Sequence, residues 1–177
     1  MNYENLAWLY KPEIIKTLLI GEAPPLSGKK YFYDIPKEYK PRNCTIENDT
    51  SLPATIFNHY FGTMPKNEKE YQIYLNLLKN RGVFLIDIIN KNLEIRKKDR
   101  TLNKENIKLL VSEDNLKELK QRIRNISNEN TKIIFLLPRN NYLKQLKDNF
   151  INASYINWKC FRLDIREVLD CDNITCP

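Results

Sequence analysis

The chain has 177 residues, of which 42% are hydrophobic and 29% charged, a balance typical of a globular domain rather than a disordered segment. Its 29 basic and 22 acidic residues give a net charge of +7, which favours polyanions, nucleic acid first, as partners. No apolar run is long enough to cross a bilayer and no signal-peptide pattern opens the chain, so we expect a cytoplasmic protein without a membrane partner.

The first elements in the chain are predicted to be a helix and a buried strand. Apolar residues recur at near-helical spacing from Tyr3 to Ile15, and Pro12 is a break or restart within them. An apolar strand at 17–21 then ends in the turn Gly21-Glu22-Ala23-Pro24-Pro25. The strand therefore places an acid at one edge of a sheet, followed by a rigid turn that has few backbone N–H donors.

Cations and aromatic rings follow this turn. Lys29 and Lys30 lead into Tyr31, Phe32 and Tyr33, so anion binding, stacking and acid chemistry can share one pocket. The stretch from Asp34 to Leu52 is polar and without a clear period, which predicts a long loop. Loops of this length are often functional.

The middle of the chain predicts two helices and a second strand. One helix starts at Ser51 and ends at Gly62, and another covers about 67–80. The buried strand at 83–89 contains a single acid, Asp87, which we expect to be paired or functional because an isolated buried charge is costly.

The remaining elements continue the alternation of helices and strands. The predicted elements are a basic loop at 90–101, helices at 103–111 and after Ser112, a strand at 132–137, a helix around 142–150, a short strand within 154–163 and a helix at 163–169. Alternation of this kind predicts an α/β fold, a three-layer α/β/α sandwich with a central, mainly parallel four-stranded sheet. We expect residues 1–177 to form a single domain and the protein to be a monomer.

Two kinds of site are not supported by the motifs. Counted from Gly21, a phosphate-binding loop needs a glycine where Leu26 stands; counted from Gly28-Lys29, it needs a hydroxyl where Lys30 stands. The four cysteines are scattered and form no C-x-x-C pair, so we predict no metal site and no cofactor: Cys44, Cys160, Cys171 and Cys176.

Three segments together resemble the uracil-DNA glycosylase superfamily: Gly21-Glu22-Ala23-Pro24-Pro25, Tyr31-Phe32-Tyr33 and Gly82-Val83-Phe84-Leu85-Ile86-Asp87. The resemblance covers roughly the first half of the chain and the strand order implied for the rest. It implies a DNA glycosylase-like protein that hydrolyses the N-glycosidic bond of a flipped damaged or deaminated base, with duplex or single-stranded DNA as its partner.

The resemblance also implies roles for individual residues. Glu22 and Asp87 would be the catalytic residues, Glu22 helping the water or the sugar cation and Asp87 reading the edge of the base. Phe32 or a neighbouring tyrosine would stack on the base. The remaining assigned residues are Gly21, Ala23, Pro24, Pro25 and Asn157 for the substrate, and Lys29, Lys30 and Arg162 for DNA.

The sequence departs from the superfamily in its second motif. The region from Ser154 to Arg162 contains neither histidine nor proline, and only Asn157, Trp158 and Arg162 are placed to substitute for that motif. The cysteine spacing does not match the iron-sulfur branches, so we predict no cluster. This departure favours an alternative, a catalytically inactive module that binds DNA, a nucleotide or a protein.

Structural explanations remain open for each candidate residue. Glu22 can cap a helix or pair with Lys29, and the rings of Tyr31, Phe32 and Tyr33 can belong to the core. The only histidine, His59, is expected to be a hydrogen-bonded helix residue. A third alternative for the whole chain is a small-molecule enzyme or nucleotide-binding protein on an unrelated doubly wound sheet.

Overall fold

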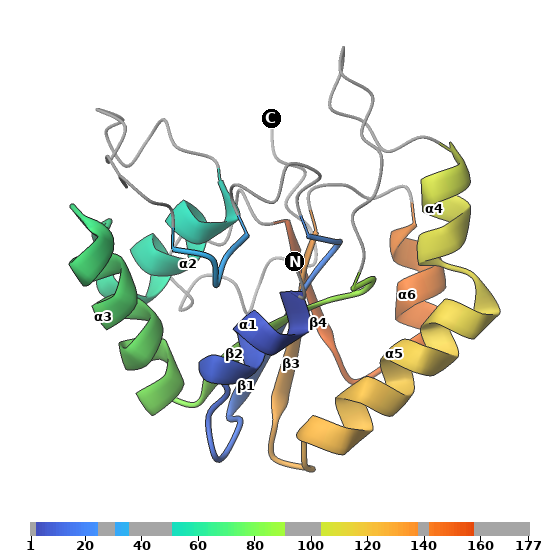
Figure 1. Cartoon of the computed structure of the whole chain (residues 1–177). Helices are drawn as coiled ribbons and strands as arrows, with labels where there is room; N and C mark the ends of the chain where they lie inside the picture. The colour runs from blue at the N-terminus through green and yellow to red at the C-terminus, as the bar shows by residue number, and fades with distance from the viewer. Residues whose placement is uncertain (1–2, 25–30, 36–50, 91–103, 138–141, 158–177) are drawn as a thin grey trace.

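The structure is a computed structural model of the chain, and it describes residues 3–24, 31–35, 51–90, 104–137 and 142–157 (Figure 1). Within these ranges it contains a single four-stranded sheet flanked by helices. The strands are β1 (Thr17–Gly21), β2 (Val83–Asp87), β3 (Lys132–Leu137) and β4 (Ser154–Asn157). The helices are α1 (Tyr3–Leu9), α2 (Leu52–Phe61), α3 (Glu68–Asn80), α4 (Lys104–Leu110), α5 (Glu113–Ile126) and α6 (Leu143–Asn149).

All four strands are parallel and lie in the order β2-β1-β3-β4. The central strand β1 is almost entirely apolar, and its Leu18, Leu19 and Ile20 are completely buried. Strands with continuous apolar sequence suit a parallel sheet, because helices cover both of its faces. The predicted α/β fold with a mainly parallel four-stranded sheet is therefore confirmed.

The helices cover opposite faces of the sheet. The chain passes from β1 to β2 through α2 and α3, then returns across β1 to β3 through α4 and α5. Because parallel crossovers are right-handed, these opposite directions of travel put their helices on opposite sides. Figure 1 shows α2 and α3 on one side and α4, α5 and α6 on the other, which makes the three layers of the sandwich.

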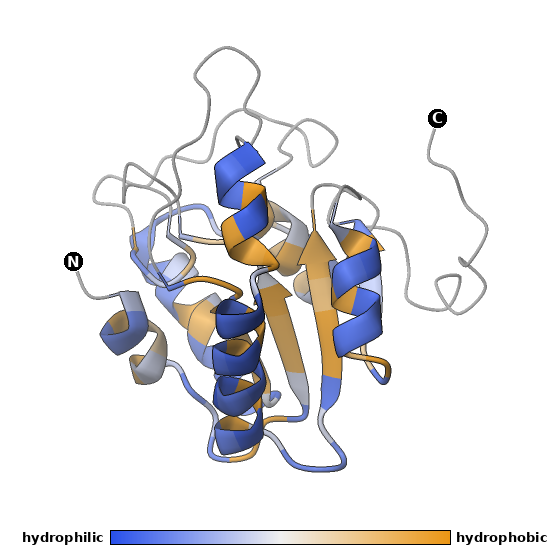
Figure 2. Cartoon of the chain, turned by 90° about the vertical axis from the view of Figure 1, so that its right-hand side faces the viewer, coloured by the Kyte–Doolittle hydropathy of each residue, from blue (hydrophilic) through white to orange (hydrophobic). Residues whose placement is uncertain are grey.

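The helices turn their polar faces to solvent and their apolar faces to the sheet. In α5 the buried residues are Leu116, Leu119 and Ile123, spaced three and four apart, and Ser112 caps its N-terminus. Figure 2 shows the resulting pattern of polar outer faces on α5 and α6 over apolar strands.

Two predicted boundaries were wrong. The first helix ends at Leu9 rather than Ile15, because Pro12 has no N–H and restricts Lys11 to extended conformations. The second strand ends at Asp87 rather than at residue 89. The N–H groups of Ile88 and Ile89 still bond to the carbonyls of Gly21 and Glu22, at 2.9 and 3.2 Å, so the strand exits stay together beyond the regular sheet.

Candidate functional site

The candidate site lies at the carboxyl ends of β1 and β2. The register pairs Gly21 with Asp87, so the acid that ends the second strand lies beside the glycine that precedes Glu22. The neighbouring strands β1 and β3 lead to helices on opposite faces, α2 and α6 respectively. This makes a topological switch point between β1 and β3, beside Glu22 and one strand away from Asp87. Open α/β sheets bind ligands at such points, outside the carboxyl ends of their strands.

Gly21 leaves room for the carboxyl group of Asp87. A Cβ atom at position 21 would lie 2.6 Å from Oδ1 of Asp87 and 3.7 Å from Cδ2 of Leu52, at the start of α2. The first of these distances is too short for any real contact. The absence of a side chain at Gly21 therefore lets the Asp87 carboxyl group lie across the end of the neighbouring strand.

Asp87 is a buried acid whose pKa is raised far above the ordinary range of a carboxyl group. Asp87 is only 7% exposed. Burial raises the pKa of Asp87 to about 7, against the opposing effect of the positive charge of Arg122 and with a further increase from the negative charge of Glu22. A carboxyl group with such a pKa can donate a proton or accept one near pH 7.

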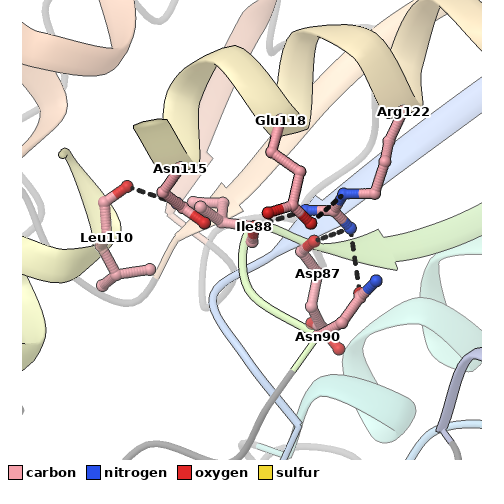
Figure 3. A network of polar contacts seen from close by, with 7 residues as sticks. All are labelled: Asp87, Ile88, Asn90, Leu110, Asn115, Glu118 and Arg122. Atoms are coloured by element: carbon pink, nitrogen blue, oxygen red, sulfur yellow. Dashed lines mark hydrogen bonds and ion pairs between the residues drawn. The ribbon is translucent and has the colours of Figure 1, made fainter. Parts of the chain in front are cut away.

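Arg122 on α5 binds the backbone of the β2 exit rather than the carboxylate of Asp87 (Figure 3). Its guanidinium donates to the carbonyl oxygens of Asp87 at 3.0 Å and Ile88 at 2.5 Å, and to Oδ1 of Asn90 at 2.9 Å. Its Nε lies 3.8 Å from Oε1 of Glu118. Arg122 thus fixes the turn that follows Asp87 at the end of β2.

Glu22 is held by a residue that the sequence alone did not single out. The hydroxyl of Tyr142 donates a hydrogen bond to Oε1 of Glu22. Tyr142 is 1% exposed and directly precedes α6, so this bond spans the switch point from the β1 exit to the β3 side. In the sequence Tyr142 is one apolar member of a helical stripe, and only its place just after the third strand indicates a role in the site.

The three aromatic residues 31–33 lie in the core. Tyr31, Phe32 and Tyr33 are between 4% and 6% exposed. The hydroxyl of Tyr33 accepts from the N–H of Leu85 at 2.7 Å and donates to its carbonyl at 3.2 Å, on the outer side of the edge strand β2. The core alternative therefore describes where these rings lie, and a stacking role for Phe32 stays a prediction.

Phe32 is fixed from both its ring and its backbone. Its ring centroid is 5.5 Å from that of Phe57 on α2, and its carbonyl accepts from the hydroxyl of Tyr71 on α3 at 2.9 Å. These contacts anchor the segment against the face of the sheet that α2 and α3 cover.

Asn157 lies at the same edge of the sheet but not beside Asp87. It ends β4 opposite Leu137, one residue beyond the level of Gly21. Two strand spacings separate β4 from β1 and three separate it from β2, about 10 and 14 Å respectively. Asn157 is therefore positioned to reach a ligand from the β4 side rather than to contact Asp87.

The other residues discussed in the sequence analysis lie partly within and partly outside the described ranges. Ala23 is half-buried and Pro24 is buried, directly after Glu22. His59 lies on α2, with its ring 4.8 Å from that of Tyr60. Outside the described residues lie Pro25, Lys29, Lys30, Trp158, Arg162, the predicted helix at 163–169 and all four cysteines.

Membrane spans and clustered metal ligands are both absent from the part of the chain that the structure describes. No helix there is long and apolar enough to cross a membrane. No group of three or more histidine, cysteine, aspartate or glutamate side chains in the same ranges could hold a metal ion.

The fold and the site together define an α/β protein with acids at two adjacent strand exits, Glu22 beside the switch point of the sheet and Asp87 one strand away from it. Comparisons with protein-family models, with curated proteins and with solved structures find no match. A function for this chain is therefore inferred from the chemistry of its two carboxyl groups.

Proposed function

We propose that this protein hydrolyses the N-glycosidic bond of a damaged or deaminated base flipped out of DNA, at the carboxyl ends of β1 and β2. The observation that carries the proposal is the pair of acids Glu22 and Asp87. They occupy adjacent strand exits but differ in environment, one bound by Tyr142 and the other buried with a pKa of about 7. Pairs of carboxyl groups in different environments commonly divide acid and anion roles.

The two acids match the charges that develop in glycosidic cleavage. As the bond breaks, positive charge grows on the sugar and negative charge on the leaving base. A carboxylate at Glu22 stabilises the sugar cation and orients the attacking water, and Asp87 faces the polar edge of the base. Electrostatic stabilisation of this kind is usually the largest catalytic contribution, and the reaction consumes only water.

The charge of the chain supports a nucleic-acid substrate. The net charge of +7 attracts a polyanion, and Lys29 and Lys30 follow the Glu22 turn closely in the sequence. An enzyme acting on a base in a duplex must first extrude it, and phosphate contacts on either side hold the flanking strand while it does so.

Base release from defined oligonucleotides tests the proposal. Single-stranded and duplex oligonucleotides carrying uracil, hypoxanthine or xanthine are incubated with the wild type, Glu22→Gln and Glu129→Gln. Glu129 is an exposed acid in the turn before β3, at the opposite end of the sheet, so it is the matched control. We expect release by the wild type and the control and a loss of about 100-fold or more in Glu22→Gln.

The alternative is a module that binds DNA on the same scaffold without cleaving it. The segment from Ser154 to Arg162, which has neither histidine nor proline, favours this alternative. Salt-dependent binding of every oligonucleotide, with no release of any base, would establish it in place of the hydrolase.

A further inference from the structure

We propose that Tyr142 is a positioning residue that places the shared proton of the acid pair on Asp87, so that Glu22 is the anion and Asp87 the neutral hydrogen-bond donor. The catalytic meaning of this arrangement rests on the proposed function. The arrangement itself is a property of the ligand-free protein and is tested without a substrate.

The hydrogen bond from Tyr142 stabilises the ionised form of Glu22. Tyr142 is a buried phenol, and its O–H donates to Oε1 of Glu22. A donor aimed at a carboxylate stabilises the ionised form more than the neutral form, because hydrogen bonds to a charged acceptor are the stronger ones. Tyr142 therefore favours a negative charge on Glu22.

The carboxyl group of Asp87 lacks comparable support. In the part of the chain that the structure describes, no hydrogen bond or ion pair reaches its carboxyl oxygens. The donors of Arg122 point to the carbonyls of Asp87 and Ile88 and to Asn90 instead. A buried carboxyl group without donors favours its neutral form.

Most of the groups around Asp87 also favour the neutral form of its carboxyl group, and one group opposes it. Glu22 lies at the β1 exit and its charge raises the pKa of Asp87. Tyr31 and Tyr33 also interact electrostatically with Asp87, but the hydroxyl of Tyr33 is already bound to Leu85. From α2 the apolar Leu52 reaches the same space, with its Cδ2 3.7 Å from where a Cβ of residue 21 would lie. Only Arg122 on α5 acts in the opposite sense among the described residues.

The environments of the two acids therefore favour different protonation states. The charge of an ionised Glu22 adds to the effect of burial in keeping the proton on Asp87, and that proton goes to the group with fewer donors. The site then presents an O–H donor at Asp87 for an acceptor atom of a ligand, next to an anion at Glu22 for a positive centre. A leaving base and a sugar cation are such a combination.

Carbon-13 NMR titration of the carboxyl groups in the ligand-free protein tests the inference. In the wild type, Asp87 holds its proton to a higher pH than Glu22. In Tyr142→Phe we expect Glu22 to take up a proton at a pH about one unit higher. Asp87 should lose its proton at a lower pH, by a smaller shift, because Tyr142 acts on it only through the charge of Glu22. Unchanged titration of both groups, or ionisation of Asp87 below Glu22 in the wild type, would overturn it.

Two further variants keep the test decisive. Tyr155→Phe is the matched control, because the Tyr155 hydroxyl also lies against α6, but its single hydrogen is shared between the carbonyls of Leu146 and Phe150, at 2.9 and 3.0 Å, rather than donated to an acid. It leaves both titrations unchanged. Glu22→Gln removes the neighbouring charge, so Asp87 loses its proton at lower pH in that variant even if Tyr142→Phe does not fold. An Asp87 titration that is the same in Glu22→Gln as in the wild type would contradict the coupling.

The titration tests the placement of the proton and the activity assay tests the proposed function, so either claim can be rejected without the other. If no base is released but the titrations behave as described, the proton placement stands and the proposed function is lost. If bases are released, Tyr142→Phe moves the alkaline limb of the pH profile to lower pH, because Asp87 then ionises at a lower pH.

Discussion

At the scale of single residues, the site depends on one absent side chain and one buried acid. Gly21 has no Cβ atom, and the space that a Cβ would fill is taken by Oδ1 of Asp87. The acid in turn is buried and has a pKa of about 7, above the ordinary value near 4. Both features place a carboxyl group at the strand exit at some expense of stability, which is common at functional sites.

Substitution of Gly21 tests the contact with Asp87. In Gly21→Ala the new methyl group meets a carboxyl oxygen attached to a strand, so we expect destabilisation by about 1–3 kcal/mol in urea unfolding. Because the clash is with that carboxyl group alone, Gly21→Ala costs less in an Asp87→Ala background. Additive effects of the two substitutions in the double-mutant cycle would show that the two side chains do not meet.

The raised pKa of Asp87 predicts how stability depends on pH. The folded protein holds the Asp87 proton up to about pH 7, and the unfolded chain releases it near pH 4, so the contribution to stability is complete below about pH 4 and lost by about pH 7. The loss approaches about 1.4 kcal/mol per pH unit between these values.

Asp87→Asn removes this dependence, because the amide carries no charge at any of these pH values. We expect its free energy of unfolding to exceed that of the wild type at about pH 8 and the excess to shrink toward about pH 5. Urea unfolding of both proteins at the two pH values measures the difference. A difference that stays constant with pH would mean that Asp87 titrates normally.

At the scale of elements, α5 holds the second strand exit in place through Arg122. A single guanidinium binds two successive carbonyls and the side chain of Asn90, which a lysine cannot do because its donors do not form a planar fork. The helix α5 therefore packs against the sheet and, through Arg122, also holds the turn that follows Asp87.

Substitution of Arg122 by lysine measures how much the hydrogen bonds of the guanidinium stabilise the folded protein. Arg122→Lys keeps the charge but loses the fork, so we expect destabilisation by about 2–4 kcal/mol. Arg124 lies exposed on the same helix, and Arg124→Lys is the control with an effect within about 0.5 kcal/mol. Equal stability of the two variants in urea would contradict a structural role for the fork.

The elements differ in how well the sequence predicts them. The strands at 17–21 and 132–137 were predicted to the residue, because each is a short apolar run with clear ends. The end of the second strand was not, because the apolar run continues through Ile88 and Ile89 beyond the regular sheet. The end of α1 was not, since Pro12 can restart a helix as well as end it. Periodicity places Arg122 on a helix and Tyr142 at the start of one but does not indicate their polar contacts, because those contacts join segments far apart in the sequence.

At the scale of the whole molecule, the sheet order explains why the acids meet. Strands β1 and β2 are far apart in the sequence but pair in register, which brings Gly21 and Asp87 to one level. The alternation of helices and strands predicted this class of sheet, and the resemblance to a known superfamily singled out both acids. Neither could predict that Asn157 lies across the sheet from Asp87.

The net charge of the molecule leads to a prediction about DNA affinity. The logarithm of the binding constant falls with the logarithm of salt concentration, by about 0.9 for each phosphate neutralised. If Lys29 and Lys30 each contact a phosphate, the double variant to alanine lowers this slope by about 2. Fluorescence anisotropy with a labelled duplex measures it, and an unchanged slope would exclude both lysines from the interface.

The pH profile of base release by the wild type and Asp87→Asn tests the central claim most directly, because it joins the buried acid to the chemistry. We predict that release by the wild type falls above about pH 7 as Asp87 ionises. Release by Asp87→Asn, whose amide remains a donor, should show no such fall. The account would be contradicted if neither protein releases a base, or if Asp87→Asn keeps the alkaline fall of the wild type.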